Sequence, residues 1–219
     1  MFFKKPNRGY LQALLAGIGW GTVGLWLQYI NGRAIDIAFL RMAAAGLFFG
    51  MGKFQFNLKA MILGGILAIQ FIATIAAFQL LSIGTATLSV NLNLLFLSIF
   101  LFPTLPQKKL RLVLLTVAFV ALWLVFYDGF KLYGFLIGTS ASFLFALYTF
   151  LAERFALDMK VQMPMIFLTA TVVTGAISFL TGFQAIEITR SFVIALLFLV
   201  GLSTIAAHHS FLASVKNIG

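Results

Sequence analysis

Polar side chains inside long apolar segments are the residues of this sequence that could do chemistry. Arg41 lies within the apolar run 35–52. A charged side chain at the centre of a membrane helix costs about 2.5–3.5 kcal/mol on insertion scales, so such residues tend to be functional. A guanidinium can bind a carboxylate through two parallel hydrogen bonds, which favours an anionic solute as its ligand. The alternative is a structural arginine that bonds helix-end carbonyls, reaches the outer interface or pairs with nearby Asp36.

Amide side chains occupy similar positions. Asn91 and Asn93 lie in the middle of one apolar run, and Gln70 and Gln79 lie in another. Each amide could line a solute pathway or form a hydrogen bond to a neighbouring helix. Residues two apart on a helix face different directions, so we expect only one of the two asparagines to line a pathway.

Aromatic residues could form a wall for a solute. Trp20 lies between glycines, in a stretch where Gly17, Gly19, Gly21 and Gly24 make one helix surface thin. Trp26 follows in the same apolar run and Tyr148 lies in a later one. Simple packing is the alternative for any aromatic residue in a chain with 26 phenylalanines. The predicted substrate-binding residues are therefore Trp20, Arg41, Gln70, Gln79, Asn91 and Tyr148.

The only two histidines, His208 and His209, are adjacent in the last apolar run. Either could act as a proton relay, because imidazole titrates near neutral pH. No acidic residue lies in the apolar part of a segment to exchange the proton, which argues against this role. Adjacent side chains diverge by about 100° on a helix. We therefore expect no metal site, and no cofactor.

The composition excludes an ordinary soluble domain. Of the 219 residues, 62% are hydrophobic and 9% are charged, whereas soluble domains have about a quarter charged. A membrane-crossing helix needs about 20 apolar residues, and the runs lack the alternation of a β-barrel. We predict an all-α, polytopic membrane bundle of about eight helices. The expected segments are 10–30, 35–52, 59–81, 85–103, 109–127, 131–153, 162–182 and 190–213.

The basic residues predict the orientation, because Lys and Arg concentrate in cytoplasmic loops. With a cytoplasmic N-terminus, one side of the membrane has eleven basic residues and the other has three, Arg33, Lys131 and Arg190. The eleven are Lys4, Lys5, Arg8, Lys53, Lys59, Lys108, Lys109, Arg111, Arg154, Lys160 and Lys216. Both termini are therefore expected to be cytoplasmic, in the cell (inner) membrane. The net charge of +10 is then explained by contact with the lipid bilayer, without nucleic acid.

A weak internal repeat divides the chain. The third apolar run leads into Ile83-Gly84, and the eighth leads into Ile218-Gly219. Five segments separate these endings, and a repeat with an odd number of helices inverts its topology, as in many secondary transporters. We expect an inverted five-helix repeat, with helices 1–5 in residues 1–130 and helices 6–8 of an incomplete second repeat in residues 131–219. The last two helices of a ten-helix protein are expected to be missing.

Three short motifs occur in the apolar runs: Gly19-Trp20-Gly21-Thr22 in the first, an apolar stretch closed by Arg41 in the second, and Ala146-Leu147-Tyr148 in the sixth. These motifs resemble the drug/metabolite transporter superfamily in its EamA-type branch. Many members have a Gly-Glu pair at the end of the fourth helix, where this chain has Phe102-Pro103-Thr104. The resemblance implies ten helices and the transport of small molecules.

We therefore expect a secondary transporter or exporter of small metabolites, such as amino acids or related compounds, that works by alternating access. The alternative is a non-transporting membrane scaffold or regulatory subunit. An enzyme is not expected, because the chain has no phosphate-binding loop, no Gly-x-Ser-x-Gly and no His-Glu-x-x-His motif. The expected partners are a small-molecule substrate and lipid, and the sequence leaves a homo-oligomer open.

Overall fold

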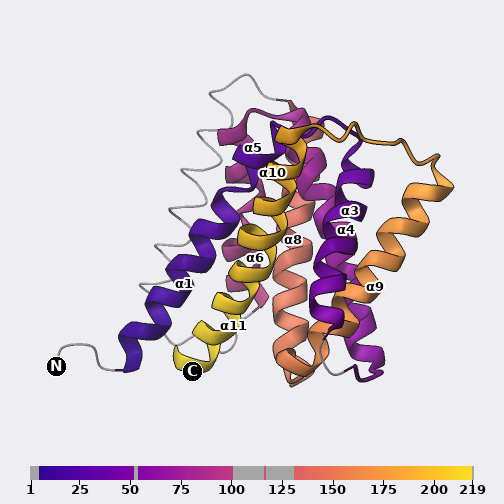
Figure 1. Ribbon diagram of the computed structural model, residues 1–219. Coiled ribbons are helices and arrows are strands. Elements are labelled where there is room, and N and C mark those ends of the chain that lie inside the picture. Colours follow the sequence, from indigo (N-terminus) through magenta and orange to yellow (C-terminus); the bar gives the residue numbers. More distant parts are fainter. Residues whose placement is uncertain (1–4, 52–53, 101–115, 117–130, 219) are drawn as a thin grey trace. The chain divides into compact units, whose positions relative to one another are not determined.

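The computed structural model describes residues 5–51, 54–100, 116 and 131–218, and these residues form helices with no strand among them (Figure 1). Seven of the eight predicted segments are helical. The remaining one, 109–127, lies outside the described residues except for Thr116. The helices are α1 (Lys5–Gly21), α2 (Val23–Leu27), α3 (Ala34–Gly50), α4 (Leu58–Leu80), α5 (Ile83–Val90), α6 (Asn93–Phe100), α8 (Leu132–Arg154), α9 (Met159–Leu180), α10 (Arg190–Val200), the π-helical turn η1 (Gly201–Ala206) and α11 (Ala207–Ile218).

Four helices are long and apolar enough to cross a membrane, so the chain is an integral membrane protein. Their mean hydropathies lie between 1.8 and 2.2, and a span needs about 20 apolar residues. They are Leu58–Leu80, Leu132–Arg154, Val161–Leu180 and Arg190–Phe211. Two shorter apolar helical stretches, Leu14–Leu27 and Ile83–Leu97, cover parts of other predicted segments. The all-α fold is thus confirmed for the described residues, with four long spans where about eight were expected.

Side-chain caps explain where three helices begin. The Asn57 Oδ1 atom accepts a hydrogen bond of 2.9 Å from the Lys59 backbone N–H at the start of α4. Ser82 caps α5 and Thr189 caps α10 in the same way. Each cap satisfies a backbone donor that has no partner inside its own helix.

The described residues form two compact units. The terminal unit comprises the two ends of the chain, 1–32 and 184–219, and the central unit comprises 33–183. In the terminal unit, α1 packs along η1 and α11, and α2 packs against α10. In the central unit, α9 packs against α3 and α4, while α8 packs against α4, α5 and α6 (Figure 1). The predicted sequence repeats, 1–130 and 131–219, stay a prediction.

Glycines let the helices of the central unit approach closely. A Cβ atom at Gly64 of α4 would lie 2.5 Å from the Ile166 carbonyl oxygen and 2.7 Å from the Thr169 Cβ of α9. A Cβ at Gly138 of α8 would clash with the Ser89 side chain of α5. Small residues at such crossings increase van der Waals contact, which drives helix association where lipid removes the hydrophobic effect.

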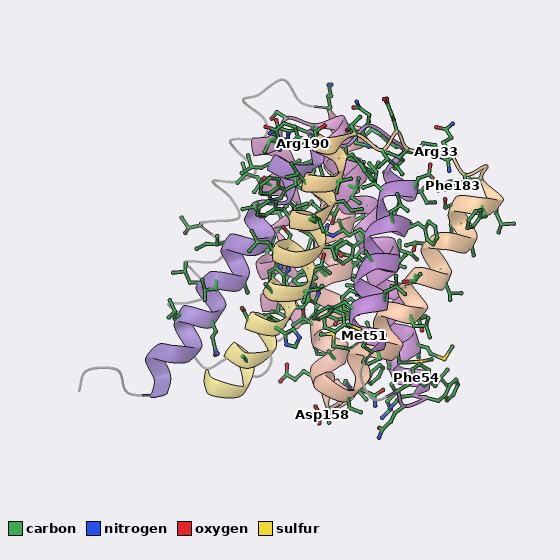
Figure 2. The ribbon with its side chains drawn as sticks, viewed as in Figure 1. Arg33, Met51, Phe54, Asp158, Phe183 and Arg190 are labelled. Carbon is green, nitrogen blue, oxygen red and sulfur yellow. The ribbon has the colours of Figure 1, made fainter. Side chains whose placement is uncertain are left out.

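The two ends of the central unit are well separated. Figure 2 shows Arg33 and Phe183 at one end, and Met51, Phe54 and Asp158 at the other. Arg33 precedes α3 and Phe183 follows α9, so these two packed helices are antiparallel. A position along one helix can therefore be matched to a level on the other.

Candidate functional site

A charged cluster fastens α3 to α9 at the Arg33 end of the central unit. The Arg33 Nε atom donates to Asp36 Oδ2 at 2.9 Å, and its Nη1 donates to the Thr181 carbonyl oxygen at 2.8 Å. The Ser178 hydroxyl donates to Asp36 Oδ1 at 2.5 Å. Asp36, which was one alternative partner for Arg41, thus forms its ion pair with Arg33. Residues three apart lie on one helix face, whereas residues five apart do not.

Contacts along the α3–α9 interface set the level of Arg41. Asp36 meets Ser178, a Cβ on Gly175 would contact the Phe39 ring, and a Cβ on Gly46 would contact Thr171. Arg41 lies between Phe39 and Gly46, so it is level with the stretch of α9 between Thr171 and Gly175. This level is near the middle of α3.

The side chain of Arg41 is buried in the central unit, with 1% of its surface exposed. Its Cζ atom lies 4.3 Å from the centroid of the Phe71 ring of α4. A guanidinium at this distance is attracted by the negative face of the ring, and the attraction is stronger where water is absent. The Arg41 guanidinium is therefore enclosed by the side chains of the central unit.

Gln70, the residue before Phe71, has a fixed amide. Its Nε2 atom donates to the Thr74 Oγ1 at 3.0 Å, one helical turn further along α4. Its Oε1 atom is buried and has no hydrogen-bond partner among the described residues. Such an acceptor has lost its hydration without gaining a donor.

Tyr148 of α8 reaches the same level. A Cβ at Gly134 would touch Leu81, and a Cβ at Gly138 would lie 3.4 Å from Ala77. Since α8 and α4 therefore run antiparallel, Tyr148 lies near the middle of α4, at the level of Leu67 to Phe71. Its side chain is 2% exposed. Its hydroxyl is buried with no hydrogen-bond partner in the part of the chain that the structure describes.

Arg41, Gln70, Thr74 and Tyr148 thus lie at one level of the central unit, on three adjoining helices. We call these four residues the polar layer. Of the six predicted substrate-binding residues, the structure places Arg41, Gln70 and Tyr148 in this layer. Arg41 and Tyr148 are buried and Gln70 is partly buried with an inaccessible Oε1 atom, and a polar group inside an apolar helix is retained only at a free-energy cost.

The other predicted site residues lie elsewhere. Asn91 is exposed where α5 ends, and its Nδ2 donates to the Thr87 carbonyl oxygen of its own helix at 2.7 Å. Asn93 begins α6 after this break. Gln79 is exposed near the end of α4. Trp20 belongs to α1 in the terminal unit.

In the terminal unit, Trp20 packs on the last helix. Its ring centroid lies 5.6 Å from that of His208 in an edge-on arrangement, and 5.4 Å from that of Phe211. The His208 Nδ1 lies 2.8 Å from the Thr204 carbonyl oxygen, and the side chain is 2% exposed. His209 is exposed. The two candidate proton relays therefore have opposite surroundings.

Two backbone irregularities face each other in this unit. Helix α1 ends at Gly21, and the Thr22 hydroxyl lies 3.2 Å from that of Ser203 in the π-helical turn η1. A Cβ at Gly19 would lie 3.1 Å from the Leu202 carbonyl oxygen of that turn. Gly17 and Gly21 have no such neighbour within 4 Å. The lack of a side chain therefore allows close packing at Gly19, whereas no other described segment packs closely at Gly17 or Gly21.

Sequence reasoning missed this pair of irregularities. Hydroxyl residues inside an apolar helix were the available signal, since they compete with the backbone for hydrogen bonds. The Thr204 Oγ1 donates to the Leu199 carbonyl oxygen, five residues back. Isolated π-helical turns occur often at functional sites. Trp26, a candidate for the aromatic wall, packs on Phe198 instead, with the two ring centroids 4.2 Å apart.

Among the described residues, no group of three or more His, Cys, Asp or Glu side chains could hold a metal ion. No family model, no curated protein and no solved structure matches this chain. Its motifs and its polar layer are therefore what a functional proposal has to be built on.

Proposed function

We propose that this protein is a secondary transporter or exporter of small metabolites that works by alternating access, with Arg41 as the anchor for the solute. The observation that carries the proposal is the burial of Arg41 at mid-level of an apolar helix, over the Phe71 ring. An ionisable residue inside a membrane helix is by default a candidate for the solute pathway. A guanidinium favours a solute with a carboxylate group.

The surroundings of Arg41 support the same proposal. The polar layer combines a positive charge with amide and hydroxyl groups, and two of the three helices that hold it, α4 and α8, are long and apolar enough to span a bilayer. Transporter sites lie near the bilayer midplane and are often formed by discontinuous helices. The breaks between α1 and α2, and between α5 and α6, provide discontinuous helices in this chain.

The finer parts of the proposal come from the sequence. They are an EamA-type protein in the inner membrane, cytoplasmic termini, and inverted repeats in residues 1–130 and 131–219. In such a protein the two repeats rock about the polar layer, exposing it to each side of the membrane in turn.

The test uses purified protein in proteoliposomes and compares uptake of radiolabelled amino acids and small carboxylates. Arg41→Met removes the charge at similar length, and we expect its uptake to fall by about ten- to a hundredfold, the equivalent of one charged hydrogen-bonded contact. Arg190→Gln, at the exposed first position of α10, is the matched control and should transport at the wild-type rate. Arg41→Lys, which keeps the charge but loses the planar fork, should retain partial uptake.

Thermal unfolding of each variant separates loss of transport from loss of folding. If folded Arg41→Met transports like wild type, Arg41 is not the anchor. If wild-type protein moves no solute but co-purifies with one partner protein, the scaffold or regulatory subunit is the better explanation.

A further inference from the structure

Two buried polar atoms of the polar layer share one feature. The Gln70 Oε1 atom and the Tyr148 hydroxyl are both inaccessible, and neither has a hydrogen-bond partner among the described residues. They belong to α4 and α8, two helices that pack along their lengths. Most buried polar side-chain atoms in proteins have a partner, so two exceptions at one level need an explanation.

Both side chains face the α4–α8 interface. Gln70 lies two turns before Ala77, the residue of α4 that adjoins Gly138, and so shares its helix face. Tyr148 is two turns after Ala141, on the face of α8 that also includes Gly134 and Gly138. The Tyr148 ring stacks on that of Phe145, at 6.2 Å between centroids. The hydroxyl is therefore held on a rigid ring, close in level to the Gln70 amide.

The chemistry of the two groups defines their ligand. With its Nε2 committed to Thr74 at 3.0 Å, the Gln70 amide presents an oxygen that can only accept. A phenolic hydroxyl can both donate and accept. Together they suit a ligand group that carries a hydrogen-bond donor, such as an amine or a hydroxyl. A hydrocarbon group would form no hydrogen bond with either of them.

We infer that Gln70 and Tyr148 form a subsite that selects solutes carrying a hydrogen-bond donor beside the group held by Arg41. This inference rests on the proposed transport function. Gln70 directly precedes Phe71, on whose ring Arg41 lies, so the subsite and Arg41 are at the same level of the central unit. A site that must satisfy buried polar groups rejects analogues that lack the matching group.

The transport experiment uses two matched sets of labelled solutes in proteoliposomes. The small set is alanine, lactate and propionate, and the large set is phenylalanine, phenyllactate and phenylpropionate. In at least one set, wild type should take up the amino or hydroxy compound in preference to the unsubstituted acid. Tyr148→Phe and Gln70→Leu should lower that preference by about tenfold, the effect of one hydrogen bond. Tyr133→Phe, at a 72% exposed position of the same helix, is the matched control and should keep the preference.

Thermal unfolding of the solute-free protein gives a readout that does not depend on transport. If Tyr148 serves a ligand, Tyr148→Phe should unfold at the wild-type temperature or higher. If its hydroxyl instead holds the fold together, unfolding should occur about 2–4 °C lower, and the subsite is refuted. Equal preference in wild type and Tyr148→Phe also refutes it, while leaving transport intact. Uptake of neither set would overturn the proposed function, and the unfolding comparison would still decide whether the Tyr148 hydroxyl is structural.

Discussion

Ser178 of α9 donates a hydrogen bond of 2.5 Å to the fully buried carboxylate of Asp36 in the first turn of α3. The same carboxylate takes two hydrogen bonds from Arg33, whose guanidinium also contacts Thr181. A buried charge is tolerated only when its hydrogen-bonding capacity is filled. The first turn of a helix also favours negative charge. Asp36 is therefore the residue about which this end of the α3–α9 pair is organised.

Removing the Ser178 hydroxyl tests this role. We expect Ser178→Ala to destabilise the protein by about 1.5–3 kcal/mol, because a hydrogen bond to a buried charged group is lost. The measurement is thermal or denaturant unfolding in detergent. Ser140→Ala is the matched control, because Ser140 is exposed and bonds only within α8. It should stay within about 0.5 kcal/mol of wild type. Equal losses in the two variants would show that the Asp36 contact is unimportant.

The Gly64–Gly65 pair tests the close approach of α4 and α9. Gly64→Ala should destabilise the protein by about 1–3 kcal/mol, because the added methyl would overlap the Ile166 carbonyl and Thr169. Gly65→Ala meets nothing within 4 Å. It should be neutral or stabilising by up to about 1 kcal/mol, as alanine favours a helix. The measurement is the unfolding temperature of both variants, and the opposite order would place α9 elsewhere.

The adjacent histidines allow a paired test of proton coupling. If uptake is driven by protons, we expect His208→Gln to abolish its stimulation by a pH gradient, because His208 is the buried one of the pair. His209 is exposed, and His209→Gln should respond to the gradient like wild type. Uptake is measured with and without an imposed gradient. Stimulation that survives in His208→Gln would exclude this residue as the relay.

Because the chain has no cysteine, its orientation can be tested with single introduced cysteines. Phe56 lies between α3 and α4 with 74% exposure, and Ile188 lies before α10 with 77% exposure. The distribution of basic residues predicts that Phe56 is cytoplasmic and Ile188 external. On intact cells, a membrane-impermeant maleimide should label Ile188→Cys but not Phe56→Cys. The reverse pattern would invert the proposed topology.

Hydropathy predicted the long helices well, because a long apolar run with charged residues at both ends is typical of a membrane helix. The predicted segment 59–81 corresponds to the helix Leu58–Leu80, and the predicted segment 131–153 corresponds to the helix Leu132–Arg154. The breaks within the first, fourth and last segments were not predicted. Hydropathy reports the free energy of transferring side chains from water to lipid. A helix break depends instead on which backbone carbonyl accepts the hydrogen bond of each backbone N–H.

The candidate site was predicted in part for a similar reason. Arg41 and Gln70 stood out as polar residues within apolar runs, and both are in the polar layer. Gln79 stood out equally but is exposed, because burial depends on which helices pack beside α4. The partner of Asp36 could not be predicted, since Ser178 is 142 positions away in the sequence.

The π-helical turn Gly201–Ala206 changes the phase of the last helix. An α-helix advances by about 100° per residue. The wider turn holds one extra residue, so the helix beyond it continues with the winding that it would have without that residue. Everything after Ala206, including His208, is rotated relative to a continuous α-helix built on α10. An alignment of this helix with a straight one such as α4 therefore needs a one-residue gap. Deleting a single residue from the turn would therefore restore regular winding and leave His208 facing Trp20.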